Sequence, residues 1–66
     1  MPVWLVGQVR GHGQWEVQGV FSSEDKAVAA CRNQWHFVMP LELDAELPDQ
    51  TTTELPAGTY YPRASV

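Results

Sequence analysis

The sequence predicts an α+β fold: a small ββαβ domain with a three-stranded mixed sheet in the order 2-1-3, one helix on one face and an extended C-terminal arm. Two observations predict the domain. Apolar and polar residues alternate through three segments, as expected of half-buried strands, and a short capped helix lies between the second and third. A third observation predicts the arm, because after Asp44 the alternation stops and a stretch with three prolines begins. We therefore assign residues 1–44 to the domain and 45–66 to an arm that packs on its own or a neighbouring subunit.

The first two strands are expected to form a β-hairpin. Residues 3–10 and 14–21 both alternate, and Gly11-His12-Gly13 between them supplies a flexible turn. Because the side-chain period of a strand is two, the alternation also assigns residues to faces. One face of the hairpin is expected to carry Val3, Leu5, Gly7, Val9, Trp15, Val17, Gly19 and Phe21.

A helix is expected to begin after Ser22-Ser23. A serine hydroxyl can accept a hydrogen bond from a free amide of the first turn, and Glu24 and Asp25 suit the positive end of a helix. The helix runs to about Asn33, and its inner stripe consists of the small residues Ala27, Ala30 and Cys31. So short a helix is not stable alone, and small residues allow it to pack closely on a sheet.

The third strand is expected over residues 35–44. One of its faces carries Phe37, Met39, Leu41 and Leu43. Pro40 lacks an amide donor, which indicates an edge strand or a bulge. A right-handed crossover through the helix makes this strand parallel to the second and antiparallel to the first. The simplest sheet then has the first strand in the middle.

The two faces of this sheet differ in composition. The face with Leu5, Trp15 and Phe37 is nearly all apolar, and we expect the helix to cover it. On the mixed face, four apolar residues lie among polar ones: Trp4, Val6, Val20 and Val38 among Gln8, Glu16, Gln18 and Glu42. One helix covers only one face, so the mixed face needs another cover. We expect either a second subunit or the arm, through Leu47, Leu55, Tyr60 or Tyr61.

Size and composition limit the classes of function. At 66 residues the chain is near the lower limit for folding around one core, and its single cysteine excludes an intramolecular disulfide. Because no spaced set of metal ligands is visible either, we expect a homo-oligomer, a dimer or larger, to complete the core. Four basic residues against eight acidic ones argue against direct binding to duplex nucleic acid. The apolar start is too short for a membrane span and lacks the basic flank of a signal peptide, so we expect a cytoplasmic protein without membrane contact.

Little in the sequence indicates catalysis. Cys31 is expected on the inner stripe of the helix as a small buried residue, and Gly11-His12-Gly13 lacks the Lys-Ser/Thr of a phosphate loop. No nucleophile, base and orienting group can be assembled, so we expect no enzyme, no metal site and no cofactor. The candidate partner- or ligand-binding residues are Trp4, Arg10, His12, Tyr60, Tyr61 and Arg63.

The strongest of these candidates is the segment Tyr60-Tyr61-Pro62-Arg63. Tyrosine and arginine dominate binding hot spots because they combine area with directed hydrogen bonds, and Arg63 suits a carboxylate or a phosphate. The tyrosines can equally serve to anchor the arm on the open face of its own domain. The sequence leaves both interpretations open.

Two segments carry a resemblance to a known class of proteins. They are WEVQGVFSS (residues 15–23), which leads into AVAACR (residues 27–32), and PAGTYYPR (residues 56–63). Through them the chain resembles small uncharacterised accessory proteins of tailed phages and prophages. The resemblance implies a non-catalytic protein that binds and occupies a host or phage protein in the host cytoplasm, in a class that includes inhibitors of host defence.

Two alternatives remain. The chain could sequester a small nucleotide signal, with aromatic rings holding the base and Arg10, Arg63 and glycine amides of the turn holding the phosphate. It could instead be a component of virion assembly, which its presence in purified particles would show.

Overall fold

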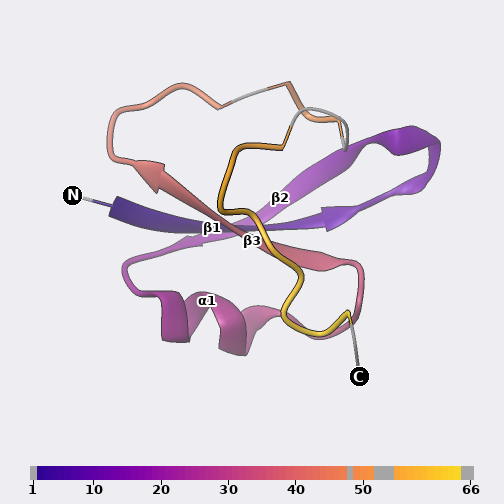
Figure 1. Cartoon of the computed structure of the whole chain (residues 1–66), viewed down its shortest axis with the longest axis horizontal. Helices are drawn as coiled ribbons and strands as arrows, with labels where there is room; N and C mark the ends of the chain where they lie inside the picture. Colours follow the sequence, from indigo (N-terminus) through magenta and orange to yellow (C-terminus); the bar gives the residue numbers. More distant parts are fainter. Residues whose placement is uncertain (1, 48, 52–54, 65–66) are drawn as a thin grey trace.

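Three strands form a sheet in the computed structural model, which describes residues 2–47, 49–51 and 55–64 (Figure 1). β1 (Pro2–Val9) lies in the middle, between β2 (Trp15–Phe21) and β3 (His36–Glu42). β1 pairs antiparallel with both neighbours, so β2 and β3 run parallel to each other on opposite sides of it. The α+β class and the strand order 2-1-3 are confirmed.

The connection between β1 and β2 is a short 3-10 turn, η1 (Gly11–Gly13). His12 (φ 69°) and Gly13 (φ 71°) both adopt left-handed backbone, which glycine accepts readily and histidine only occasionally. Across the turn, the backbone N–H of Arg10 donates to the carbonyl of Gln14 at 2.7 Å. The predicted hairpin is therefore present.

A β-bulge in β2 changes which face its side chains occupy. Val6 pairs with Gly19, but the next residue of β1 pairs with Val17, which leaves Gln18 as an extra residue. One extra residue reverses the alternation for everything beyond it. Phe21 therefore lies on the face opposite to the predicted one, and that assignment is wrong.

The helix α1 (Glu24–Ala30) begins where its capping residues predict. Ser23 is the N-cap, with extended backbone and an Oγ that accepts from the N–H of Lys26 at 3.3 Å. The helix ends before the predicted limit at about Asn33. Cys31 has already left helical backbone (φ −77°, ψ 122°), although its N–H still donates to the carbonyl of Val28 at 3.0 Å.

β3 is also shorter than the predicted strand over residues 35–44, since it begins at His36 and ends at Glu42. Two residues later, Asp44 adopts left-handed backbone at φ 70° and the chain turns away from the strand direction. Pro40 lies in β3, at an edge of the three-stranded sheet, as its missing amide predicts.

The helix covers the face of the sheet opposite to the one predicted. Its small residues pack on a helix-side cluster, which contains buried Val6, Ala27, Cys31 and Val38 with partly buried Trp4, Phe21, Val28, Ala30 and Tyr60. The prediction that α1 meets the face of Leu5 and Phe37 is therefore wrong. In the middle of β1 and β3 the residues on both faces are apolar. The alternation therefore separates the two faces but does not indicate which of them the helix covers.

The arm covers the face that was expected to meet the helix. An arm-side cluster there contains buried Leu5, Trp15, Phe37 and Met39, with partly buried Val9, Leu41, Leu55 and Tyr61 packed against them. The rings of Trp15 and Phe37 meet edge to face, with centroids 5.2 Å apart and planes at 85°. Large side chains from the sheet and from the arm fill this side, whereas small helical residues fill the other.

The arm passes from one edge of its own sheet to the other (Figure 1). At the β2 edge, Gln14 and Thr51 form an antiparallel bridge, and the indole Nε1 of Trp15 donates to the carbonyl of Thr51 at 3.1 Å. At the β3 edge, Val38 and Tyr60 exchange two backbone hydrogen bonds of 2.8 and 3.1 Å. The arm of the same chain thus covers the face opposite to α1, whereas the mixed face, for which the sequence predicts a second cover, is covered by the helix.

Candidate functional site

The predicted contact residues Tyr60 and Tyr61 lie on opposite faces of the sheet, because neighbours in an extended segment point in opposite directions. Tyr61 packs edge to face on Phe37, with ring centroids 5.7 Å apart. Tyr60 packs on the helix-side cluster, and its hydroxyl donates to Oε2 of Glu24 at 2.5 Å. That hydrogen bond is the main cause that raises the pKa of Tyr60 to about 12. Both tyrosines thus anchor the arm to its own domain.

Arg63 contacts the C-terminal end of α1. Its Nε donates to the carbonyl of Cys31 at 3.1 Å, and its Nη2 donates to the carbonyl of Val28 at 3.4 Å. Carbonyls at the end of a helix need donors from outside it, and a cation there also balances the negative pole of the helix dipole. The last turn of α1 contains no basic residue. The arm therefore supplies the capping cation.

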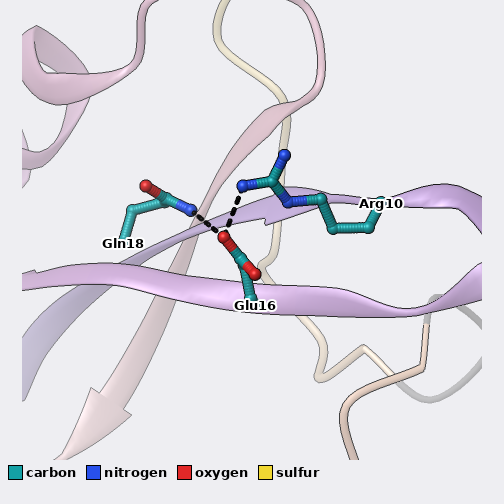
Figure 2. A network of polar contacts seen from close by, with 3 residues as sticks. All are labelled: Arg10, Glu16 and Gln18. Atoms are coloured by element: carbon teal, nitrogen blue, oxygen red, sulfur yellow. Dashed lines mark hydrogen bonds and ion pairs between the residues drawn. The ribbon is translucent and has the colours of Figure 1, made fainter.

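The remaining three predicted residues have separate surroundings. Trp4 is half-buried at the border of the helix-side cluster, and His12 is exposed in the hairpin turn. Figure 2 shows Arg10 and Gln18 donating to the same carboxylate oxygen of Glu16, at 2.5 and 3.0 Å. The hydrogen bond from Arg10 is the main cause that lowers the pKa of Glu16. Since these contacts are spread over both faces and the turn, the six predicted residues do not form one site.

A polar cavity of about 450 Å³ lies beside the C-terminal end of α1, and we refer to it as the helix-end cavity. Its lining consists of apolar Val6, Phe21 and Ala30 and polar Gln8, Gln18, Arg32, Asn33 and His36. The sheet and the helix both contribute, because α1 is too short to cover the whole helix side of the sheet. The result is a concave surface with apolar and hydrogen-bonding walls.

His36 is the most buried polar residue of this lining, at 7% exposed. The Oδ1 of Asn33 accepts from the backbone N–H of Trp35 at 2.8 Å and lies 3.1 Å from Nδ1 of His36. The backbone N–H of Arg32 lies 3.4 Å from the same nitrogen. These contacts fix the orientation of the imidazole and leave Nε2 as its other polar atom.

A shallower groove of about 250 Å³ lies at the turn end of the hairpin, lined by Val9, Arg10, Gly11 and Trp35. Trp35 is 53% exposed. Its backbone is nevertheless fixed on both sides, because its N–H donates to Asn33 and its carbonyl accepts from the N–H of Val9 at 2.9 Å. The groove therefore presents an exposed indole from a well-held backbone.

Cys31 is 2% exposed, and its Sγ lies 3.5 Å from the carbonyl of Ala27. Burial raises the pKa of this thiol, which is the opposite of what a reactive cysteine requires. Within the described residues, no three His, Cys, Asp or Glu side chains are grouped to hold a metal ion. In the same part of the chain, no helix has the length and apolar character to span a membrane.

Comparison with known proteins provides no relative for this chain. No family model matches it, and neither a curated protein nor a solved structure does. The resemblance to phage accessory proteins therefore stays a prediction. Any functional conclusion has to be drawn from the surface of the molecule.

Sequence reasoning does not find the helix-end cavity as a group. It places Gln8 and Gln18 on a mixed face, and His36 falls within the third strand predicted over residues 35–44. One signal does point to the cavity: Gly19 inside an alternating strand indicates a bulge, and a bulge redirects its neighbours. The segment between α1 and β3, which contributes Arg32 and Asn33 to the cavity, carries no comparable signal in the sequence. The position of its side chains depends on where the helix ends.

Proposed function

We propose that this chain is a non-catalytic binding protein whose partner is another protein, contacted by Trp35. The observation that carries the proposal is the half-exposed indole on a fixed backbone. Tryptophan is enriched in binding hot spots. A backbone that is already ordered reduces the entropy lost when a partner immobilises the side chain.

The proposed contact lies at the turn end of the hairpin and not on the arm. Tyr60, Tyr61 and Arg63 all contact the domain of the same chain, so a partner would have to displace them. The resemblance to phage proteins supports a host or phage protein as the partner, with inhibition of host defence or virion assembly as its context. Homo-oligomerisation also stays a prediction, and the mixed face from which it was partly inferred is covered by α1.

The small-nucleotide alternative, with the residues that the sequence suggests for it, has less support. It relies on Arg10 and Arg63 for the phosphate, and both guanidinium groups already bind groups of the chain, Glu16 and the end of α1. Two of the candidate aromatic rings, those of Tyr60 and Tyr61, lie on opposite faces of the sheet and cannot hold one base between them. Thermal melting with mono- and cyclic nucleotides tests this alternative directly.

The protein-binding proposal is tested by affinity capture from host cells with three forms of the full chain: wild type, Trp35→Ala and Leu43→Ala. Leu43 is 59% exposed and serves as the matched control for loss of exposed apolar surface. We expect one protein to co-elute in stoichiometric amount with the wild type and with Leu43→Ala, but not with Trp35→Ala. Equal capture by all three forms, or no stoichiometric protein with any of them, would contradict the proposal.

A further inference from the structure

We infer that the helix-end cavity is a binding site for a small organic anion, whose phosphate or carboxylate group is held by Arg32. This inference goes beyond the proposed protein contact, which uses other residues. It rests on three features of the cavity: the charge around it, the chemistry of its walls and the local backbone that shapes it.

The first feature is the charge of the cavity lining, which holds an arginine and no described carboxylate although the protein is acidic. The chain has a formal charge of −4 and only four basic residues. One of these four, Arg32, lines the cavity, and the described residues of the lining include no Asp or Glu. Such a distribution favours an anion.

Among the described residues, the charges nearest the cavity are balanced except at Arg32. Glu16 stays ionised because Arg10 lowers its pKa, and the two form a neutral pair. Arg63 offsets the negative pole at the end of α1. Arg32 is exposed, and within the described part of the chain its one hydrogen bond is from its backbone N–H to Nδ1 of His36. Its guanidinium is thus the group best placed for a ligand anion, in a planar fork that matches phosphate or carboxylate.

The second feature is the chemistry of the walls. Gln8 and Gln18 supply amide donors and acceptors, and the fixed imidazole of His36 supplies Nε2. Val6 and Phe21 provide an apolar surface for the body of a ligand. A volume of about 450 Å³ lies within the range of about 300 to 1,000 Å³ for small-molecule sites. The ligand is therefore an organic anion with a polar, partly flat body, up to the size of a nucleoside monophosphate.

The third feature is the bulge in β2, which places both Gln18 and Phe21 on the helix side of the sheet. Bulges frequently redirect side chains next to binding sites. Gly19 completes this arrangement, because an ideal Cβ there would lie 3.1 Å from the ring of Phe21. The absence of a side chain at Gly19 allows that ring to lie close to the strand at the edge of the cavity.

The test is a titration of the full chain followed by ¹H–¹⁵N NMR, which reports on the side-chain amides of Gln8 and Gln18 separately. The probes are inorganic phosphate, acetate, a nucleoside 5′-monophosphate and the corresponding neutral nucleoside, each to about 10 mM, which saturates a millimolar site. We expect shifts at the cavity residues with an anionic probe. Comparison of phosphate with acetate distinguishes a phosphate ligand from a carboxylate ligand. Comparison of the nucleotide with both shows whether the body of the ligand contributes to binding.

Two variants isolate the role of Arg32. Arg32→Gln removes the proposed anion contact, and Lys26→Gln removes the same charge from the first turn of α1, outside the cavity lining. We expect Arg32→Gln to weaken binding about tenfold, the loss of one charged hydrogen-bond contact, and Lys26→Gln to change it less than about twofold. Equal effects of the two variants, equal binding of the neutral nucleoside, or no shifts with any probe would overturn the inference.

Discussion

Gly7 shows how a single residue determines the packing of the arm-side cluster. It lies in β1, between the strands that carry two rings of this cluster, Trp15 in β2 and Phe37 in β3. An ideal Cβ at Gly7 would lie 2.5 Å from Cζ of Phe37 and 3.1 Å from Cε3 of Trp15. The edge-to-face contact of those rings therefore needs a residue without a side chain at this position.

We predict that Gly7→Ala destabilises the protein by about 2 kcal/mol, because the buried Phe37 has no room to move away from an added methyl group. Gly11→Ala is the matched control, since an ideal Cβ there has nothing within 4 Å. Urea unfolding followed by tryptophan fluorescence measures both variants. A loss of stability in Gly7→Ala no larger than that in Gly11→Ala would show that the core accommodates the methyl group.

At the scale of elements, local signals in the sequence predict the strands and the start of the helix well. The N-cap hydrogen bond of Ser23 and the hairpin turn involve only neighbouring residues, so the sequence specifies them directly. The bulge at Gln18 is harder, because it is defined by the register with β1 and not by β2 alone. Which face α1 covers is harder still, since Val6 and Leu5 are both buried and each would suit a helix.

The contact between the arm and α1 gives a prediction about pH. The pKa of Tyr60 is raised from 10 to about 12, mainly because its hydroxyl donates to Glu24. The folded state therefore favours the neutral phenol. This stabilisation is complete below the unfolded pKa of about 10 and is lost as pH rises through about 12.

An absorbance titration of tyrosinate measures this effect in a Tyr61→Phe background, where Tyr60 is the remaining tyrosine of the chain. We expect a midpoint near pH 12, and a return toward 10 in the additional presence of Glu24→Gln. A midpoint near 10 before Glu24 is changed would mean that the hydroxyl does not donate to that carboxylate in solution.

At the scale of the whole molecule, the sheet is covered on one side by a helix and on the other by the arm. The sequence predicts that a second cover is needed and identifies residues of the arm that can supply it, because apolar composition is a local property. It does not predict the helix-end cavity, since Gln8, Arg32 and His36 come together only after the length of α1 and the bulge are known. Tyr61 and Arg63 stand out in the sequence as binding residues, yet in the structure they hold the arm in place.

This arrangement predicts that residues 1–44 alone do not form a stable domain. Removal of the arm exposes Phe37 and Met39, both fully buried in the intact chain, and leaves the indole N–H of Trp15 without its acceptor. We expect loss of a cooperative thermal transition and binding of the dye ANS, which reports exposed apolar surface. The control is a chain that ends at Ala64, which keeps every arm contact described and should melt as the full chain does.

Addition of the arm as a separate peptide distinguishes covering of the sheet from a general effect of length. A peptide of residues 45–66, added in excess, should restore the cooperative transition of 1–44 by binding the folded form. The same peptide with Tyr60→Ala and Tyr61→Ala should not, because it lacks both side chains that lie across β3. A cooperative transition in 1–44 without peptide would show that the arm is dispensable for the core, and rescue by both peptides would show that its tyrosines do not anchor it.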